Sequence, residues 1–333
     1  MANTIQDKLA YLEETKGLIK EAIVAKGVEV TDTDTFRSYA NKIEAIQAGG
    51  GGAVNLPDGT KFVNSTFTTI SGSIISYLET QTDLSGIFEN CTSLTTVPSF
   101  DASKATDMLN MFNGCGSLQT VSQINTPNVT NMNQMFNYCE KLQTVLLFGT
   151  SNVTNMNRMF YNCRLLQTVS QFDTSKVNNM GFMFAGCTSL TTVPLLNVSS
   201  VTDMSYMFGY CISLTSVPQF DTSSVKYMGG MFSDCTNLTT VPLLNVSSVN
   251  FMDAILTDCT SLTNLGGFTG LKENLDLRYS YDITVDSVMN VINNAADMTS
   301  EPKTLVLKQY VLNKLSEEQI ATASAKGWNI AAR

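Results

Sequence analysis

Cysteine is the residue in this sequence that could carry the most varied chemistry, because a thiolate can form a disulfide, bind a metal ion or act as a nucleophile. The eight cysteines recur at intervals of 24 residues, at positions 91, 115, 139, 163, 187, 211, 235 and 259. If they stack in register, neighbouring side chains run parallel about 4.8 Å apart, somewhat wider than the Cβ separation of a disulfide. The spacing therefore predicts eight free thiols, buried as small apolar side chains.

Other residue types offer little for catalysis or metal binding. The chain has no histidine, no CxxC pair and no acidic cluster with the spacing of metal ligands, so zinc and calcium would find few donors. Histidine is also the commonest general base. The carboxylates are scattered or fall in repeated columns, whereas an enzyme needs one special site rather than eight equivalent ones. The sequence predicts no enzymatic activity, no metal and no cofactor.

The cysteines are one column of a 24-residue repeat. A leucine follows each cysteine by three residues, and a valine follows by six, except that Leu265 replaces it in the last repeat. A phenylalanine precedes the first seven cysteines by three residues, at Phe88, Phe112, Phe136, Phe160, Phe184, Phe208 and Phe232. A period of this length indicates a solenoid, in which no single rung can bury its apolar face alone.

The spacing of apolar residues changes within each rung. Met204, Met207, Phe208 and Cys211 are spaced as on one face of two helical turns, and the following Leu-Thr-Thr-Val-Pro pattern is typical of a short strand. An aspartate or asparagine stands eight residues before most cysteines, where it could cap the helical turn, at Asp83, Asp107, Asn131, Asn155, Asn179 and Asp203. The predicted fold is an α/β solenoid, a right-handed array of rungs that each contain a short parallel strand and a helical turn.

The unit NVSSVTDMSYMFGYCISLTSVPQFDTS resembles the BspA-like leucine-rich repeat, which is also found in Mycoplasma lipoproteins. The resemblance covers residues 81–268. It implies a curved leucine-rich-repeat-like solenoid with a parallel sheet on one face. It also implies a role in adhesion or binding, and it brings no common active site.

The sequence divides into five predicted segments. Residues 1–48 form a helical anchoring or oligomerisation module, and the glycines of 49–53 form a linker. Residues 54–80 form a degenerate first rung, 81–268 hold the eight repeats, and 269–333 form an α/β cap. Within the cap we expect a helix that begins at the capping box of Ser316, and Trp328 in the core.

The N-terminal module contains a heptad seam that consists of Ile5, Leu9, Leu12, Ile19 and Ile23. The seam is compatible with an intramolecular helical hairpin, with an oligomerising or anchoring module, or with both. The segment KLAYLEETKGLIKEAIVAKGVEVTDTDTFRSYANKIEAI is similar to N-terminal modules of tail-fibre and other virion-appendage proteins of gut bacteriophages. This resemblance implies a homotrimer that attaches to other virion proteins through residues 1–48.

The net charge and the N-terminal sequence restrict the classes of partner that we expect for this protein. A net charge of −9 argues against binding nucleic acid or an anionic membrane. The start MANTIQDKLAYLEE is not that of a secretory signal, and no apolar run has membrane length. We therefore expect a virion appendage protein, which leaves the cell by lysis, with a host-surface glycan or protein as its ligand. The alternatives are a BspA-like bacterial surface adhesin and a structural decoration of the virion without a ligand.

Positions that vary between rungs are the candidates for ligand contact, because packing does not dictate them. Aromatic residues appear among amides at positions five, two and one before the cysteine, at Tyr138, Tyr161, Phe182, Tyr206 and Tyr210. Exposed aromatic rings are suited to stacking on sugars or filling a pocket of a partner. They could equally be scattered surface hydrophobes. A rival surface is a threonine ladder that reflects β-propensity or binding, at Thr96, Thr120, Thr144, Thr168, Thr192 and Thr240.

Overall fold

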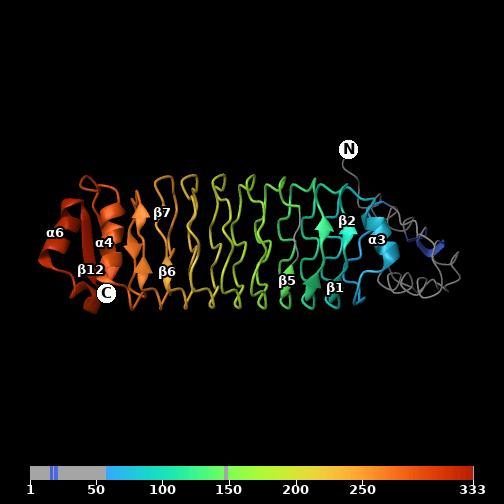
Figure 1. Cartoon of the computed structure of the whole chain (residues 1–333), viewed down its shortest axis with the longest axis horizontal. Helices are drawn as coiled ribbons and strands as arrows, with labels where there is room; N and C mark the ends of the chain where they lie inside the picture. The colour runs from blue at the N-terminus through green and yellow to red at the C-terminus, as the bar shows by residue number, and fades with distance from the viewer. Residues whose placement is uncertain (1–15, 18, 22–57, 146–148, 333) are drawn as a thin grey trace.

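The computed structural model describes residues 16–17, 19–21, 58–145 and 149–332. The chain forms an elongated solenoid, in which successive rungs lie side by side along the long axis (Figure 1). Helix α3, Gly72–Leu78, lies at the N-terminal end of the array, and helices α4, Val285–Asn294, and α6, Glu317–Ala325, lie at the opposite end. Among the described residues, no helix has the length and apolar character needed to cross a membrane.

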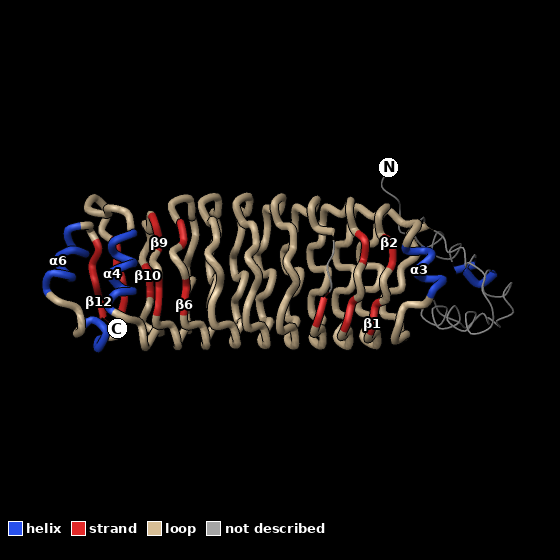
Figure 2. The backbone as a smooth tube through the Cα atoms, in the orientation of Figure 1, coloured by secondary structure: helices blue, strands red, loops and turns tan. Residues whose placement is uncertain are grey.

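Each strand of the repeat is two residues long and pairs in parallel with its equivalent 24 residues away (Figure 2). One set of paired strands contains the threonine ladder and the other follows it after a short bend. Their bounds are β1, Thr96–Val97; β2, Phe100–Asp101; β3, Thr120–Val121; β4, Ile124–Asn125; β5, Thr144–Val145; β6, Thr240–Val241; β7, Leu244–Asn245; β8, Asn264–Leu265; and β9, Phe268–Thr269. This arrangement confirms the predicted solenoid of 24-residue rungs.

The predicted helical turn of each rung is wrong in detail. The nine residues that end at each cysteine, here called the turn segment, form consecutive β-turns instead. In residues 107–115, the N–H of Met111 donates to the carbonyl of Met108 at 3.2 Å, and the N–H of Cys115 donates to that of Phe112 at 3.1 Å. The third residue of each turn, Asn110 or Gly114, has a positive φ, which an α-helix excludes. Such turns direct their first and last residues inward and so reproduce the apolar spacing of a helix.

The aspartate and asparagine column accepts hydrogen bonds from the backbone, but it does so in a turn rather than at a helix N-terminus. The Oδ1 atom of Asp107 accepts from the N–H of Leu109 at 2.8 Å, and that of Asn131 accepts from the N–H of Asn133 at 3.1 Å. This two-residue reach is that of an Asx-turn. The predicted acceptor role was therefore right, and the predicted element was wrong.

Turn segments of successive rungs are joined by backbone hydrogen bonds. The N–H groups of Met108, Asn110 and Phe112 donate to carbonyls of the next rung at 2.9–3.0 Å. Along the segment, backbone N–H groups donate in turn to an acceptor within the same rung and to a carbonyl of the next rung. The backbone donors of these buried segments are therefore satisfied. A rung without its neighbour would lose this pairing.

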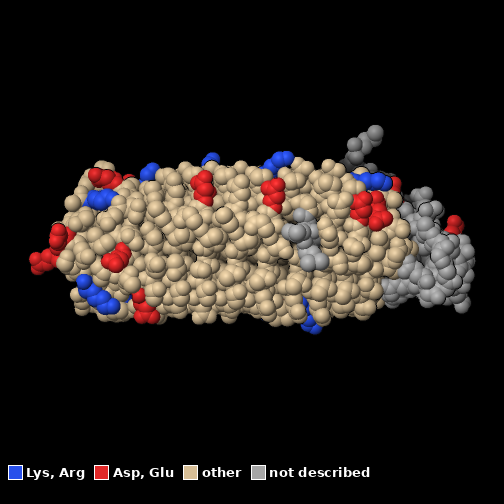
Figure 3. All heavy atoms as spheres, viewed as in Figure 1, with Lys and Arg blue, Asp and Glu red and all other residues tan. Residues whose placement is uncertain are grey.

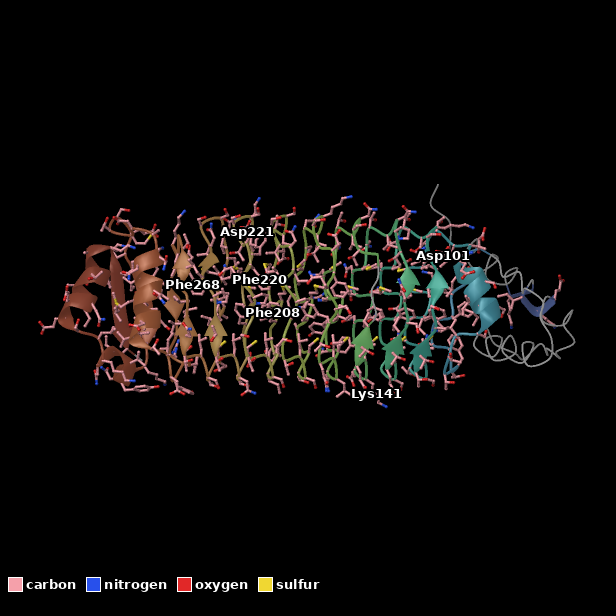
Figure 4. The ribbon with its side chains drawn as sticks, in the orientation of Figure 1. Asp101, Lys141, Phe208, Phe220, Asp221 and Phe268 are labelled. Carbon is pink, nitrogen blue, oxygen red and sulfur yellow. The ribbon has the colours of Figure 1, made fainter. Side chains whose placement is uncertain are left out.

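The core consists of identical side chains stacked along the axis. The seven phenylalanine rings of the repeat lie parallel to within 9°, with centroids of neighbouring rings 5.5–5.9 Å apart. All seven are fully buried. Figure 4 shows Phe208 and Phe220 between the edges of the rungs, whereas Lys141 projects from one edge.

Both ends of the repeat array are covered by different structure. At the N-terminal end the ring of Phe62 stacks on that of Phe88 at 5.6 Å, and α3 follows. At the C-terminal end β10, Leu275–Asp276; β11, Lys303–Leu307; and β12, Trp328–Ala332, form a parallel sheet. Helices α5 (Gln309–Leu312) and α6 pack on β12, whereas α4 packs on β8, β9 and α6. As predicted, Trp328 is fully buried and Ser316 forms a capping box with Gln319.

Removal of one phenylalanine ring tests the stacked core. We expect Phe160→Ala to lower the free energy of unfolding by about 3–5 kcal/mol, because its ring contacts rings of both neighbouring rungs and leaves a cavity. Leu165→Ala, in the same rung but with a 44% exposed side chain, is the control and should change stability by less than about 1 kcal/mol. Equal stabilities of the two variants in denaturant titrations would place the phenylalanine column outside the core.

Candidate functional site

The cysteines are all free and buried, as the sequence predicted. Each thiol donates a hydrogen bond, 3.0–3.2 Å long, to a backbone carbonyl of the previous rung. The acceptor is the repeat phenylalanine of that rung, so Cys115 donates to Phe88, and Phe62 is the acceptor for Cys91. Burial raises the pKa of Cys235 to about 12 and raises that of Cys163 well above its usual range. Thiols held in the protonated form are poor nucleophiles and poor metal ligands, so this column contributes to packing. Among the described residues, no three metal-binding side chains gather at one point.

Four of the five predicted aromatic residues meet ring to ring on the surface formed by the turn segments, and Tyr210 lies near them in the same rung as Tyr206. We call Tyr138, Tyr161, Phe182, Tyr206 and Tyr210 the aromatic row. The ring of Tyr138 meets that of Tyr161 edge to face at 5.4 Å, and Tyr161 meets Phe182 in the same way at 6.2 Å. Phe182 then stacks on Tyr206 at 5.1 Å, with the ring planes 10° apart. The row thus crosses four successive rungs.

Two further contacts hold the later rings of the row. The guanidinium of Arg158 lies 4.9 Å above the ring of Phe182, in the middle of the row. The ring of Tyr206 lies over Gly230 of the next rung, where an added Cβ would come within 2.3 Å of its Cε1. The carboxylate of Asp234 raises the pKa of Tyr210, with smaller contributions from burial and from the nearby Tyr206 and Tyr161. The hydroxyl of Tyr210 therefore remains neutral at physiological pH.

Most of the row occupies strained backbone. In all eight rungs the residues five and one before the cysteine have positive φ, because each is the third residue of a β-turn. Tyr138, Phe182, Tyr206 and Tyr210 have φ between 51° and 61°, a conformation that costs a residue with a Cβ roughly 1–2 kcal/mol. Glycine, asparagine or aspartate fills nine of the twelve other corners, at Gly86, Asn90, Asn110, Gly114, Asn162, Gly186, Gly230, Asp234 and Asp258, and the remaining three hold Gln134, Arg158 and Ala254. Bulky rings therefore stand where the backbone favours small or amide residues.

Sequence reasoning found the aromatic residues but missed the left-handed corners. The signal was present, because the column one before the cysteine is dominated by glycine, asparagine and aspartate. These three residue types tolerate positive φ best. We did not predict positive φ at these positions because we expected a helical turn, and no residue within a right-handed helix has a positive φ.

A ladder of amides adjoins the aromatic row at its N-terminal end. The Nδ2 atom of Asn113 donates to Glu89 at 2.9 Å, and that of Asn137 donates to the Oδ1 atom of Asn113 at 2.8 Å. The next side chain in this column is Tyr161, so the ladder stops there. The Oδ1 atom of Asn137 has no hydrogen-bond donor among the described residues, and the residue is 6% exposed.

The rival surface, the threonine ladder, also exists. Thr96 lies opposite Thr120, which lies opposite Thr144, and these side chains are exposed. The γ-hydroxyls of neighbouring threonines such as Thr95 donate to backbone carbonyls of the previous rung. The ladder presents hydroxyls and methyl groups without a concentration of any one chemistry. Figure 3 shows that charged side chains are sparse on the face in view.

Of the predicted oligomerisation seam, only Ile19 belongs to the described residues. Ile19 lies in helical backbone and is buried. Ile5, Leu9, Leu12 and Ile23 lie outside the described residues.

These features define a repeat protein of the parallel β-solenoid class, with a core of stacked identical side chains and a surface cluster of aromatic rings. The chain belongs to the family described as "Mycoplasma protein of unknown function, DUF285", whose profile matches residues 82–194 and 191–269, more than half of its length. The match supports the resemblance to BspA-like repeats. The resemblance of residues 1–48 to phage appendage modules receives no support from the comparisons and stays a prediction.

The solved structures that match include a TLR13–ssRNA13 complex, with 13% identity, a TM-score of 0.23, and coverage of 80% of this chain and 49% of that chain. They also include the plant peptide hormone receptor RGFR1 in complex with RGF2, with 12% identity, a TM-score of 0.15, and coverage of 81% and 71%. The present chain thus spans about half the length of the TLR13 chain. Both TM-scores are too low for either structure to bear on function. A search among curated proteins finds no match.

The thiols provide a direct test of the packed column. At pH 8 the folded protein should react with almost none of its cysteines, because all eight thiols are buried and inaccessible to the reagent. The unfolded protein, without reductant, should react with eight equivalents of a thiol reagent. Recovery of fewer than five equivalents from the unfolded protein would show that disulfides exist.

The left-handed corners make an unusual prediction for Tyr210, whose side chain is 54% exposed. Tyr210→Asn should raise the free energy of unfolding by about 0.5–1 kcal/mol, since asparagine tolerates its φ of 61° and little apolar contact is lost. Tyr310→Asn is the matched control, because Tyr310 is similarly exposed but lies in helix α5. A Tyr210→Asn variant less stable than this control would contradict the strain argument.

Proposed function

We propose that this protein is a non-enzymatic binding protein that recognises a component of a host-cell surface through its aromatic row. The single observation that carries the proposal is the contiguity of the row, in which the rings of Tyr138, Tyr161, Phe182 and Tyr206, from four successive rungs, meet one after another. Scattered surface hydrophobes would not be expected to meet in this way.

The strained backbone supports the same conclusion. Conformations that cost free energy persist where something other than stability maintains them, and binding sites are the usual place. Phe182 and Tyr206 occupy corners where glycine or asparagine stands in three other rungs and no other rung has an aromatic ring. A row with no function would be expected to drift toward those residues. Mutual ring stacking offsets part of the strain but does not account for the exposed Tyr138 and Tyr210.

We further propose that the protein acts as a phage virion appendage, in which residues 1–48 trimerise and attach to other virion proteins. The support is the sequence similarity of this segment to phage modules and its heptad seam. The BspA-like character of the repeats favours the second candidate, a bacterial cell-surface adhesin. Both functions use the same aromatic row, whereas a ligand-free decoration would not need it.

Cell binding tests the row directly. Fluorescently labelled full-length protein should bind cells in a panel of bacterial strains and epithelial lines, and a Tyr161→Ser, Phe182→Ser, Tyr206→Ser variant should lose at least about 90% of this binding. The melting temperature of the variant should stay close to that of the parent, because the three substituted side chains are half-buried and lie outside the stacked core.

Two controls separate the row from other surfaces. A Tyr281→Ser, Tyr310→Ser variant removes two exposed aromatic residues of the C-terminal cap and should bind like the parent. A Thr120→Ala, Thr144→Ala variant tests the threonine ladder. Undiminished binding by the triple variant, or loss of binding in the threonine variant alone, would show that the aromatic row is not the binding surface.

A further inference from the structure

The residues around the aromatic row indicate one chemical class of ligand. This inference rests on the proposed function, in which the row is a binding surface. We infer that the row binds an uncharged carbohydrate chain, laid along the solenoid axis from Asn137 to Tyr210. Four features of the surface lead to this ligand class: its charge, the kind of apolar surface it exposes, its unpaired hydrogen-bond acceptors and its length.

Charge argues against an ionic ligand. In the turn segments of the three rungs that begin the row, 131–139, 155–163 and 179–187, Arg158 is the one charged residue. Its guanidinium already lies over the ring of Phe182. An anionic polymer would require several cations for its affinity. A cationic ligand would require carboxylates along the whole line of rings, and these three segments contain none; the carboxylates of Asp203 and Asp234 lie only at the Tyr210 end of the row.

The apolar surface that these segments expose is aromatic rather than aliphatic. Their methionines, such as Met135 and Met159, are fully buried. The accessible apolar surface therefore consists of ring faces and edges interleaved with amides. The electron-rich face of an aromatic ring attracts weakly positive C–H groups, and a sugar ring presents a row of such groups on one face. Hydrophobic protein partners more commonly insert a central anchor residue into a pocket, whereas the rings of this surface follow one another in a line across the rungs.

Unpaired acceptors indicate a ligand that donates hydrogen bonds. The amide ladder from Glu89 through Asn113 ends at Asn137, whose Oδ1 atom finds no donor among the residues that the structure describes. The Oδ1 atoms of Asn110 and Asn133, in the same two rungs, are in the same situation within that part of the chain. A buried acceptor without a donor is unfavourable. Hydroxyl groups of a carbohydrate can donate to such amides after a small rotation of the side chains, at the point where the aromatic row begins.

The length of the row favours a chain over a single sugar. Successive rungs of a parallel stack lie about 4.8 Å apart, so the three steps from the rung of Tyr138 to that of Tyr206 span about 14 Å. Ring contacts continue without a break over this distance. A linear glycan of several residues can contact all of these rings at once, whereas a monosaccharide cannot.

The first experiment applies the full-length protein to an array of purified bacterial and mammalian glycans that contains neutral and charged members. We expect binding to neutral oligosaccharides of three or more units, and weaker or no binding to the corresponding monosaccharides. Tyr161→Ser and Asn137→Ala should each raise the dissociation constant for the bound glycan by about tenfold or more. Asn264→Ala, which removes an exposed amide on strand β8, should leave it unchanged. Binding restricted to charged glycans, or the absence of glycan binding, would overturn the inference.

The second experiment distinguishes failure of this inference from failure of the proposed function. Cells that bind the protein are treated either with periodate, which cleaves sugar rings, or with a protease. Loss of binding after periodate and retention after protease is the expected result. Retention after periodate and loss after protease would identify a protein partner, so the carbohydrate inference would fall while the surface-binding function remained. Failure of the parent to bind any cell of the panel would contradict both.

Discussion

The structure depends on in-register stacking of equivalent positions. Backbone hydrogen bonds join each turn segment and each short strand to its counterpart in the next rung. Because every rung contacts a copy of itself, a residue in one rung must be compatible with the same residue type directly above and below. Repetition of the phenylalanine and cysteine columns follows from this constraint, since parallel rings at 5.5–5.9 Å require neighbours of the same size and orientation.

The same constraint determines how thiols behave in this protein. Burial in the dry core raises the pKa of the seven thiols from Cys115 to Cys259, because ionisation would place a charge without solvent next to carbonyl oxygens. The pKa of Cys91, in the first rung, is instead lowered, chiefly by its hydrogen bond with Cys115. The hydrogen bond from each thiol to a phenylalanine carbonyl of the previous rung adds a further link between rungs. Eight cysteines that could carry redox or metal chemistry elsewhere therefore serve as small, polarisable core residues.

The surface chemistry of the solenoid can vary at the positions that stacking does not determine. The corners of the two β-turns point outward, and their backbone conformation prefers glycine or asparagine without requiring either one. In four rungs these corners hold large or aromatic residues instead, and the rings meet across rungs to form the aromatic row. A solenoid can thus alter its surface chemistry rung by rung while its core stays constant. The cost is local strain at the corners where a residue with a Cβ takes a positive φ.

The sequence alone determined the solenoid, its period, the buried columns and the membership of the aromatic row. These features can be predicted from a repeat because every rung must satisfy the same packing requirement. Positions that vary between rungs are then recognisable as positions that packing does not determine. Trp328 and the capping box of Ser316 were likewise evident from local patterns.

Only the tertiary structure decided the form of the turn segment. An apolar spacing of three and four residues fits both two helical turns and a series of β-turns, since both direct the same side chains inward. The difference lies in hydrogen bonds to the neighbouring rung, such as that from Phe112 to Met135, and an isolated segment cannot form them. The contacts within the aromatic row also depend on tertiary structure. Tyr138 and Tyr161 are 23 residues apart in the chain, and they meet because stacking brings consecutive rungs within reach of one ring.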